Sequence, residues 1–354
     1  MFLLKFFLFP LTLIALITYS EAQTTAQKAT RADSAKISSE AYALIHIPEP
    51  TFRSFQPASM DSTQIADMGF DQVYQGEPFY FLMRDGKKLF ANKFSNASTN
   101  TIILLHGVLS SSYTMNRTAG LLREATKADV FALDFRGHGQ SEGIAGDVAY
   151  IDQYADDLAD VIAAIRKSKP TGKIIIAGHS MGGGIALRYA MKKNTTKVDG
   201  YLLFAPLLGD NAPTLPKPAA TTDTTTEPFL KLHIQRIIGL HLYNSIGIHQ
   251  YDSLPVLFFN LPKEMPLTQY TYRSNKSMSP ADYAAGLKSV KSPLLVIAGS
   301  KDEAFVSSAF QPAVQKYSKG KTIIVAEASH NGIRHSHEAM KAVHTWFSKF
   351  FKQQ

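Results

Sequence analysis

Ser180 stands between two glycines in the segment KIIIAGHSMGGG, residues 173–184. The branched apolar run before the serine predicts a buried strand, and residues 183–187 after it predict the start of a helix. A G-x-S-x-G string between a strand and a helix is typical of a nucleophile elbow, a sharp turn that exposes a serine hydroxyl. The same string also arises by chance in a tight loop, so the flanking segments decide between a loop and a nucleophile elbow. That context favours Ser180 as a nucleophile.

A serine hydroxyl needs a base that accepts its proton and a carboxylate that orients the base. In folds with this elbow, the acid and then the histidine follow the serine in the chain. Asp302 and Glu303 come just after the apolar run 293–299, and His330 comes just after the run 322–328. We therefore predict His330 as the base and Asp302 as the acid, with Glu303 as the alternative acid.

The oxyanion of a tetrahedral intermediate requires two preorganised N–H donors. The main-chain N–H of Met181, directly after the nucleophile, is one candidate. The other is expected in the loop LLHGVLSSS, residues 104–112, where Val108 is favoured and Gly107 gives the loop room to turn.

No other chemistry is indicated by the remaining candidate groups. His335 and His337 fall within the next predicted helix, and their spacing does not put them on one helix face, so a metal pair is not expected. The chain has no cysteine, which excludes a thiol nucleophile, a disulfide and a thiolate metal site. We expect neither a cofactor nor a metal.

Six short apolar runs separated by helix-length segments predict parallel strands that are buried on both faces. The runs are TIILL (101–105), VFALD (130–134), KIIIAG (173–178), GYLLFA (200–205), PLLVIAG (293–299) and TIIVAEA (322–328). Before them, residues 79–94 predict an antiparallel hairpin in which Asp85 and Gly86 supply the positive φ angles of a tight turn. The fold class is α/β, a doubly wound and mostly parallel sheet.

Residues 207–292 are too long for one crossover and predict a helical cap inserted between two parts of the core, residues 77–206 and 293–354. The cap contains the Thr-rich string PAATTDTTTEP and then LHIQRIIGLHLYNSIGI, whose isoleucines and leucine recur at helical spacing. Its apolar face is expected to pack on the core. Lining an acyl-chain groove and peripheral membrane contact are the alternatives.

The N-terminal residues 1–22 place one lysine before an apolar run that ends in small residues, which predicts a signal peptide and export to the periplasm or medium. An uncleaved membrane anchor is the alternative. Residues 23–76 are predicted to be a tether and extension, because residues 23–39 are too polar to bury much surface. The net charge of +8 is scattered without an arginine-rich patch, so no nucleic-acid partner is expected.

Taken together, these motifs resemble the α/β-hydrolases, in the monoacylglycerol lipase and lysophospholipase branch that is grouped with serine aminopeptidases. The resemblance covers residues 79–351 without the cap. The motifs are His106-Gly107, DFRGHGQSEG (134–143), GHSMGG (178–183) and the late Asp302 and His330.

The resemblance implies an α/β-hydrolase fold with Ser180 as nucleophile, Asp302 as acid and His330 as base, and with Val108 and Met181 forming the oxyanion hole. It also implies that Arg136 and His138 brace the active-site loops and are not catalytic. Met181 after the nucleophile is similar to the lipid-ester branch, whereas the related iminopeptidases more often carry tryptophan there.

We therefore expect an exported serine hydrolase that cleaves carboxylic esters of single-chain lipids, such as monoacylglycerols or lysophospholipids. An aminopeptidase is the first alternative, and it would need an acidic group in the cap, from Asp252, Glu264 or Asp282, to hold the substrate's amino group. A non-enzymatic binding scaffold is the second. Oligomeric state is not predicted from the sequence.

Overall fold

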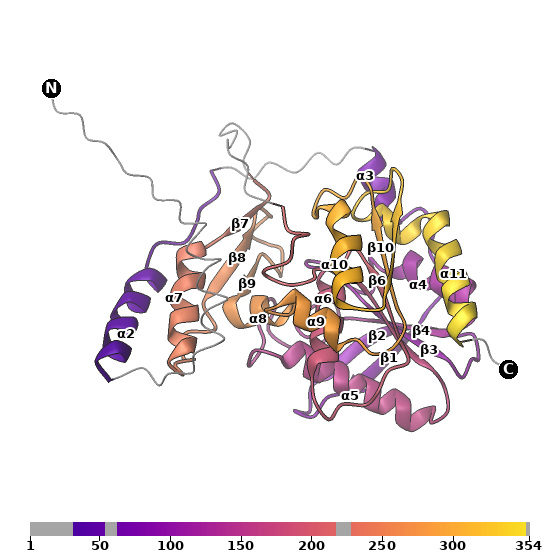
Figure 1. Cartoon of the computed structure of the whole chain (residues 1–354), viewed down its shortest axis with the longest axis horizontal. Helices are drawn as coiled ribbons and strands as arrows, with labels where there is room; N and C mark the ends of the chain where they lie inside the picture. Colours follow the sequence, from indigo (N-terminus) through magenta and orange to yellow (C-terminus); the bar gives the residue numbers. More distant parts are fainter. Residues whose placement is uncertain (1–30, 54–61, 217–227, 352–354) are drawn as a thin grey trace.

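The structure is a computed structural model that describes residues 31–53, 62–216 and 228–351 (Figure 1). The predicted signal peptide and most of the Thr-rich string of the cap lie outside these described residues. None of the helices among the described residues is long and apolar enough to cross a membrane.

Within the described residues an eight-stranded sheet forms the core, in the order β1-β2-β4-β3-β5-β6-β10-β11. The first two strands run antiparallel to their neighbours, and the other six are parallel. The strands are β1 (Glu77–Leu82), β2 (Lys88–Phe94), β3 (Thr101–Leu105), β4 (Asp129–Leu133), β5 (Ile174–His179), β6 (Gly200–Phe204), β10 (Leu294–Gly299) and β11 (Lys321–Val325). The predicted parallel sheet with its antiparallel hairpin is confirmed.

Helices cover both faces of the sheet, as a buried parallel sheet requires. One face carries α4 (Asn116–Thr126) and α11 (His337–Phe351). The other carries α5 (Gln153–Ser168), α6 (Met181–Met191), α9 (Tyr283–Ser289) and α10 (Phe310–Tyr317). Helix α11, for example, buries an apolar stripe that includes Val343 and Phe347.

The strand order changes direction between β3 and β5, because β3 leads outward to β4 while β5 leads to β6 on the other side. Loops at the carboxyl ends of such strands meet at a topological switch point, where open α/β sheets bind their ligands. The loop after β3 and the turn after β5 therefore lie together, at the same edge as the loops after β10 and β11.

The hairpin turn between β1 and β2 differs from the predicted two-residue turn. Gly86 N–H donates to the Met83 carbonyl at 2.9 Å, and among the described turn residues only Gly86 has a positive φ, of 81°. The Asp85 carboxylate forms an ion pair with the Arg136 guanidinium, with an N–O distance of 2.8 Å. The prediction of positive φ at Asp85 is wrong, because a longer turn with one left-handed glycine closes this hairpin.

The cap contains helix α7 (Ile234–Ser245), helix α8 (Tyr272–Ser277) and a small antiparallel sheet that the prediction of a purely helical cap missed. The sheet consists of β7 (Leu230–Leu232), β8 (Pro255–Phe259) and β9 (Gln269–Thr271). Val256 of β8 packs toward α7, whereas Leu257 and Phe259 pack with the main core. Alternate residues of β8 thus join the cap to the core.

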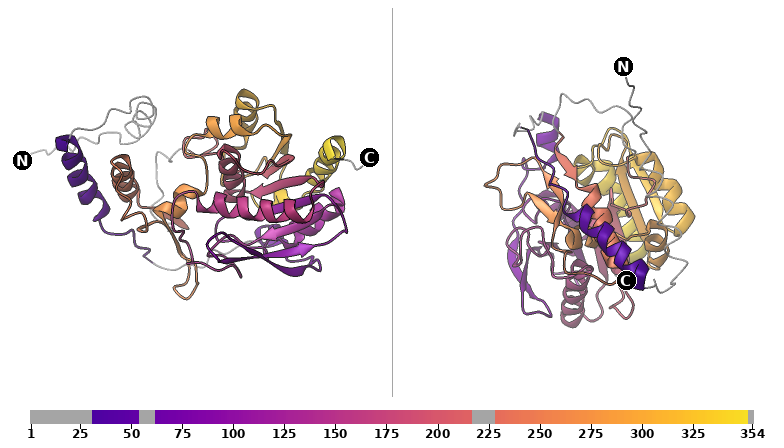
Figure 2. Two further views of the ribbon diagram at one scale, coloured as in Figure 1. Left: turned by 90° about the horizontal axis from the view of Figure 1, so that it is seen from below. Right: turned by 90° about the vertical axis from the view of Figure 1, so that its left-hand side faces the viewer.

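Helix α2 (Arg31–Ile45) packs along α7, and Figures 1 and 2 show this pair at one end of the molecule, away from the main sheet. Ala41 and Ile45 are buried against Leu240 and Tyr243. Residues 31–39 are therefore helical, and the prediction that they belong to an unstructured tether is wrong. The polar composition of residues 23–39 suggested a tether because Ala41 and Ile45, the two residues that anchor the helix, come after that segment. A second short helix, α3 (Ser62–Asp67), precedes the sheet.

Candidate active site

Ser180 forms the predicted sharp turn between β5 and α6. Its φ of 53° and ψ of −118° are strained for a residue with a side chain. A Cβ added to Gly178 would lie 2.6 Å from the Gly182 carbonyl carbon, and one added to Gly182 would lie 2.5 Å from the Leu105 carbonyl oxygen. Both glycines are thus required by close backbone approach, which is the geometry of a nucleophile elbow.

Main-chain hydrogen bonds fix the elbow from three sides. Ser180 N–H donates to the Phe204 carbonyl at 3.0 Å, and the Ser180 carbonyl accepts from Gly183 at 3.0 Å and from Leu207 at 2.9 Å. The strand β6 and the first residues of the cap insertion therefore hold the turn in place. The Ser180 hydroxyl itself has no hydrogen-bond partner among the described residues, which leaves it available to a substrate.

His330 and Asp302 meet across the loops that follow β11 and β10. His330 Nδ1 donates to both carboxylate oxygens of Asp302, at 3.0 and 3.1 Å. The Asp302 side chain is fully buried, and its Oδ1 also accepts from the N–H groups of Ala304 and Phe305 at 2.9 and 2.8 Å. The carboxylate is therefore held so that it fixes the imidazole with Nδ1 protonated and Nε2 free.

Glu303, the alternative acid, contacts a different part of the same histidine. Its Oε2 accepts from the main-chain N–H of His330 at 2.9 Å. Asp302 thus binds the imidazole while Glu303 binds the backbone, so the two adjacent carboxylates have separate positions in the site. No hydrogen bond joins His330 to Ser180 in the described residues; in unliganded enzymes such bonds often form only with substrate.

His179, directly before the serine, contributes a contact that the sequence analysis missed. Its Nε2–H donates to the His330 carbonyl at 2.9 Å, and the two imidazole centroids are 4.7 Å apart. Burial holds the pKa of His179 well below its usual value, so the ring is neutral. This bond ties the His330 loop to β5, one residue from the elbow, although its only signal in the sequence is a polar residue in a buried strand.

The predicted oxyanion loop lies beside the elbow. A Cβ added to Gly107 would lie 3.3 Å from the Cβ of Ser180. Neither the N–H of Val108 nor that of Met181 has an acceptor among the described residues. Two unpaired N–H groups next to a serine match what an oxyanion hole requires.

Tyr270 of the cap strand β9 holds the residue after Val108. Its hydroxyl oxygen accepts from Leu109 N–H at 2.9 Å, and its O–H reaches His138 Nε2 at 2.8 Å. His138 Nδ1–H donates to the Arg136 carbonyl at 2.9 Å, so Nε2 is the acceptor for Tyr270. Burial lowers the pKa of His138 to about 3, which keeps it neutral in this role.

Arg136, the other residue of DFRGHGQSEG that invites a catalytic interpretation, is engaged in a buried ion pair. Its guanidinium contacts Asp157 of α5 at 2.6 and 2.9 Å, and both side chains are about 95% buried (6% and 3% exposed). Asp134 of the same segment accepts from the N–H groups of Ser112 and Gln140. These contacts connect the segment to α5 and to the loop after β3, the bracing that the resemblance implies.

The segment before β1 reaches the loop of the histidine. Asp67, the last residue of α3, accepts a hydrogen bond from the Ser329 hydroxyl, which in turn accepts from Gly332 N–H at 2.9 Å. Arg334 is fully buried beneath this loop, where its guanidinium contacts the Asn331 and Thr114 carbonyls at 3.0 and 3.4 Å. Arg334 therefore links the His330 loop to the loop after β3.

The remaining sequence candidates lie in other environments. Asp252 is buried and bonded to Asn244, and Asp282 caps α9 by accepting from Ala284 N–H at 2.9 Å. Glu264 is exposed in the loop between β8 and β9. His335 Nε2 contacts the Thr118 hydroxyl at 3.1 Å. Among the described residues no group of three or more His, Cys, Asp and Glu side chains is placed to hold a metal ion.

A sheet of this strand order, with a serine on a strand–turn–helix at its switch point, defines the α/β-hydrolase class of proteins. The chain has the fold of this class, and its residues 96–250 match the family model described as serine aminopeptidase, S33. The chain is also similar to the monoacylglycerol lipase branch, being 30% identical to rat (Rattus norvegicus) monoglyceride lipase over 137 residues, 38% of this chain and 44% of the relative.

The chain is similar to two further proteins. An uncharacterised hydrolase of Bacillus subtilis is 33% identical over 109 residues, 31% of this chain and 38% of that protein. An esterase of Pyrococcus furiosus has the same fold, with a TM-score of 0.53 and 18% identity over 86% of this chain and all of its own. The chain spans less than half of the length of the curated relatives that it matches.

Proposed function

We propose that this protein is an exported serine hydrolase that cleaves carboxylic esters of single-chain lipids, of the monoacylglycerol or lysophospholipid type. The arrangement at the switch point carries the proposal: a strained, unbonded Ser180 beside two unpaired N–H groups, with an Asp302–His330 pair on the neighbouring loops. These are the groups that acyl transfer through a serine requires.

In the proposed mechanism Ser180 Oγ attacks the ester carbonyl carbon while His330 Nε2 takes the hydroxyl proton. Asp302 stabilises the resulting imidazolium, and the N–H groups of Val108 and Met181 bind the oxyanion. The intermediate expels the alcohol, which leaves with the proton from His330, and an acyl-enzyme remains. Water then attacks the acyl-enzyme with His330 again as the base, releasing the carboxylic acid and restoring the serine.

Esters are favoured over peptides as substrates. The similarity to monoglyceride lipases supports a lipid ester. Met181 after the nucleophile also resembles that branch. Of the three acidic groups considered for holding a substrate amine, Asp252 and Asp282 are already engaged in structural hydrogen bonds. Glu264 remains, so an aminopeptidase is the rival activity to be tested.

Export is proposed from residues 1–22 alone, as a signal peptide. Contact with lipid surfaces through the cap is supported by four exposed apolar side chains close together in the chain, Phe229, Leu230, Leu232 and Ile234. Sedimentation with phospholipid vesicles tests the contact. A double change, Leu230→Glu with Leu232→Glu, should then abolish vesicle binding and leave turnover of a soluble ester intact; unchanged binding would argue against a contact through these residues.

The direct test of the activity is labelling by a fluorophosphonate probe, combined with assays on p-nitrophenyl esters, monoacylglycerols, lysophospholipids and aminoacyl amides. We expect labelling of the wild type, none of Ser180→Ala, and turnover of the lipid esters. A wild type that is folded but neither labelled nor active would support the scaffold alternative. Preferential turnover of aminoacyl amides would support the aminopeptidase.

A further inference from the structure

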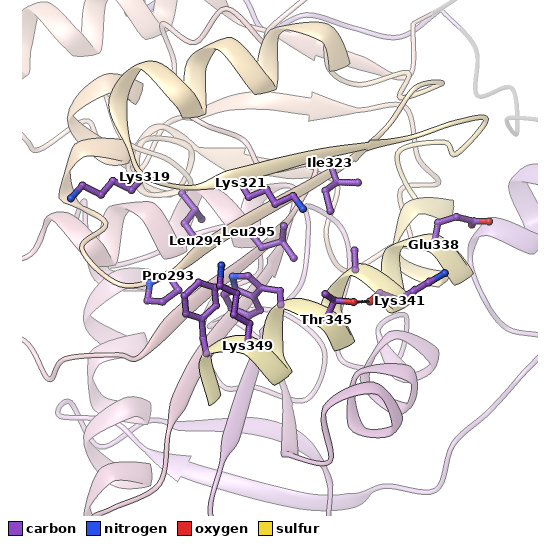
Figure 3. A pocket seen from close by; sticks show the side chains of 13 residues that line it. Pro293, Leu294, Leu295, Lys319, Lys321, Ile323, Glu338, Lys341, Thr345 and Lys349 are labelled. Atoms are coloured by element: carbon purple, nitrogen blue, oxygen red, sulfur yellow. Dashed lines mark hydrogen bonds between the residues drawn. The ribbon is translucent and has the colours of Figure 1, made fainter. Parts of the chain in front are cut away.

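A groove of about 520 Å³ lies between α11 and the edge strand β11 (Figure 3). Its lining includes residues 293–295, 319 and 321, at the amino ends of β10 and β11, whereas Ser180 follows the carboxyl end of β5. Among the described strands, β11 lies at the edge of the sheet and pairs only with β10. Leu295, Ile323, Ala342 and Trp346 form its apolar floor and walls. None of the groups assigned to the active site lines it.

Four lysines surround this apolar floor. Lys319 and Lys321 come from the strand side and Lys341 and Lys349 from the helix side, as Figure 3 shows. Glu338 is the one acidic side chain in the lining, so the lining has a formal charge of +3. None of the four ammonium groups forms an ion pair with a described residue.

We propose that this groove binds single-chain anionic amphiphiles, such as a free fatty-acid carboxylate. The apolar floor would take the hydrocarbon chain, because burying it removes apolar surface from water. The unpaired ammonium groups at the rim would bind the carboxylate by charge-assisted hydrogen bonds. Neither the apolar floor nor the lysine rim alone would select such a ligand. Together they complement its hydrocarbon chain and its carboxylate.

Two simpler explanations account for only part of this arrangement. Lysines on an edge strand prevent edge-to-edge pairing of sheets, but that role needs neither the apolar floor nor the lysines of α11. A membrane-docking surface would present several protruding apolar side chains, whereas here Leu295 and Trp346 are buried and Phe350, at 44%, is the one exposed apolar side chain of the lining. The concave shape fits a single chain that enters from solution.

Trp346 makes the proposal directly measurable, because it is the only tryptophan of the chain and it lines the groove. The experiment titrates Ser180→Ala protein with sodium dodecanoate below its micelle concentration and follows tryptophan emission. We expect a saturable change with dodecanoate and none with inorganic phosphate or the cationic dodecyltrimethylammonium. No saturable change, or equal responses to all three probes, would overturn the proposal.

Variants of the lining residues test whether dodecanoate binds in this groove. Lys321→Glu combined with Lys349→Glu should raise the dissociation constant for dodecanoate by about tenfold or more. Ala342→Phe should abolish binding by filling the floor. Lys167→Glu, an exposed lysine at the end of α5 with no described partner, is the matched control and should leave binding unchanged. If all these variants bind alike, and circular dichroism shows them folded, the ligand binds elsewhere and the proposal fails.

Discussion

The hydroxyl of Tyr270 in the cap accepts a hydrogen bond from Leu109 N–H in the loop after β3, at 2.9 Å. Leu109 has a positive φ of 55°, and its neighbour Val108 is the proposed oxyanion donor. Tyr270 is fully buried and also donates to His138. One cap residue therefore fixes a strained backbone position next to the proposed site of acyl transfer, and we predict that Tyr270 is a positioning residue.

Tyr270→Phe should lower kcat for ester hydrolysis by about tenfold, less than the 10²–10³ that loss of a whole oxyanion donor costs. KM should change little, because the oxyanion forms only after the ester is bound. Steady-state assays on a soluble p-nitrophenyl ester measure both constants.

Tyr243→Phe is the matched control, since Tyr243 is a buried cap tyrosine whose hydroxyl has no described hydrogen-bond partner. It should keep its kcat. Equal kcat values for the two variants and the wild type would show that the cap does not order the oxyanion loop.

The separate contacts of Asp302 and Glu303 predict very different effects for isosteric amides. Asp302→Asn should lower kcat by about 10⁴-fold, because the amide no longer holds the imidazole in the required tautomer. Glu303→Gln should lower it by less than about tenfold, because its amide oxygen still accepts from His330 N–H. Steady-state kinetics on the same ester compare them. The reverse ranking would make Glu303 the acid.

Because the Arg136–Asp157 ion pair is buried and outside the proposed catalytic groups, we expect its removal to lower stability without lowering kcat. Arg136→Met should lower the free energy of unfolding by about 3–5 kcal/mol, because it leaves the Asp157 carboxylate buried without its partner. Urea unfolding measures this loss. Adding Asp157→Leu should recover much of it, and the kcat of folded Arg136→Met should stay near that of wild type. A folded but inactive variant would instead give Arg136 a direct role in the reaction.

The strands and the elbow are predictable because their signals are local: short apolar runs bounded by turns, and glycines at the positions where the backbone comes closest. Contacts between residues that are far apart in the sequence are not predictable in this way. Tyr270 lies 161 residues from Leu109 and 132 from His138, and His179 lies 151 from His330. Nothing near Tyr270 in the sequence indicates its partners, because the fold alone brings them together.

The cap shows the same limit for whole elements. Strand β8 has only five residues, buried between α7 on one side and the core on the other, so it has no alternating pattern to distinguish it from a helical segment. Similarly, adjacent Asp302 and Glu303 have the same local context, and only the register of the loop decides which carboxylate contacts the imidazole.

The buried His106 and His138 and the half-buried His335 predict that the protein loses stability in acid. Burial lowers the pKa of His106 to about 4 and that of His138 to about 3, and it is also the main cause that lowers the pKa of His335 to about 3. In the unfolded chain each binds a proton near pH 6.5. Their contribution is therefore fully present above about pH 6.5 and decreases as the pH falls, by about 2 kcal/mol for each histidine at pH 5.

Urea unfolding at pH 7.5 and pH 5 measures this loss. His335→Phe removes one of the titrating groups, so the difference in unfolding free energy between the two pH values should shrink by about 2 kcal/mol relative to wild type. His337→Gln, two residues away but exposed, is the control and should leave the difference unchanged. If His335→Phe keeps the full difference, His335 already binds its proton in the folded protein. The hydrogen bond that His335 Nε2 makes with Thr118 would then have the imidazolium as its donor.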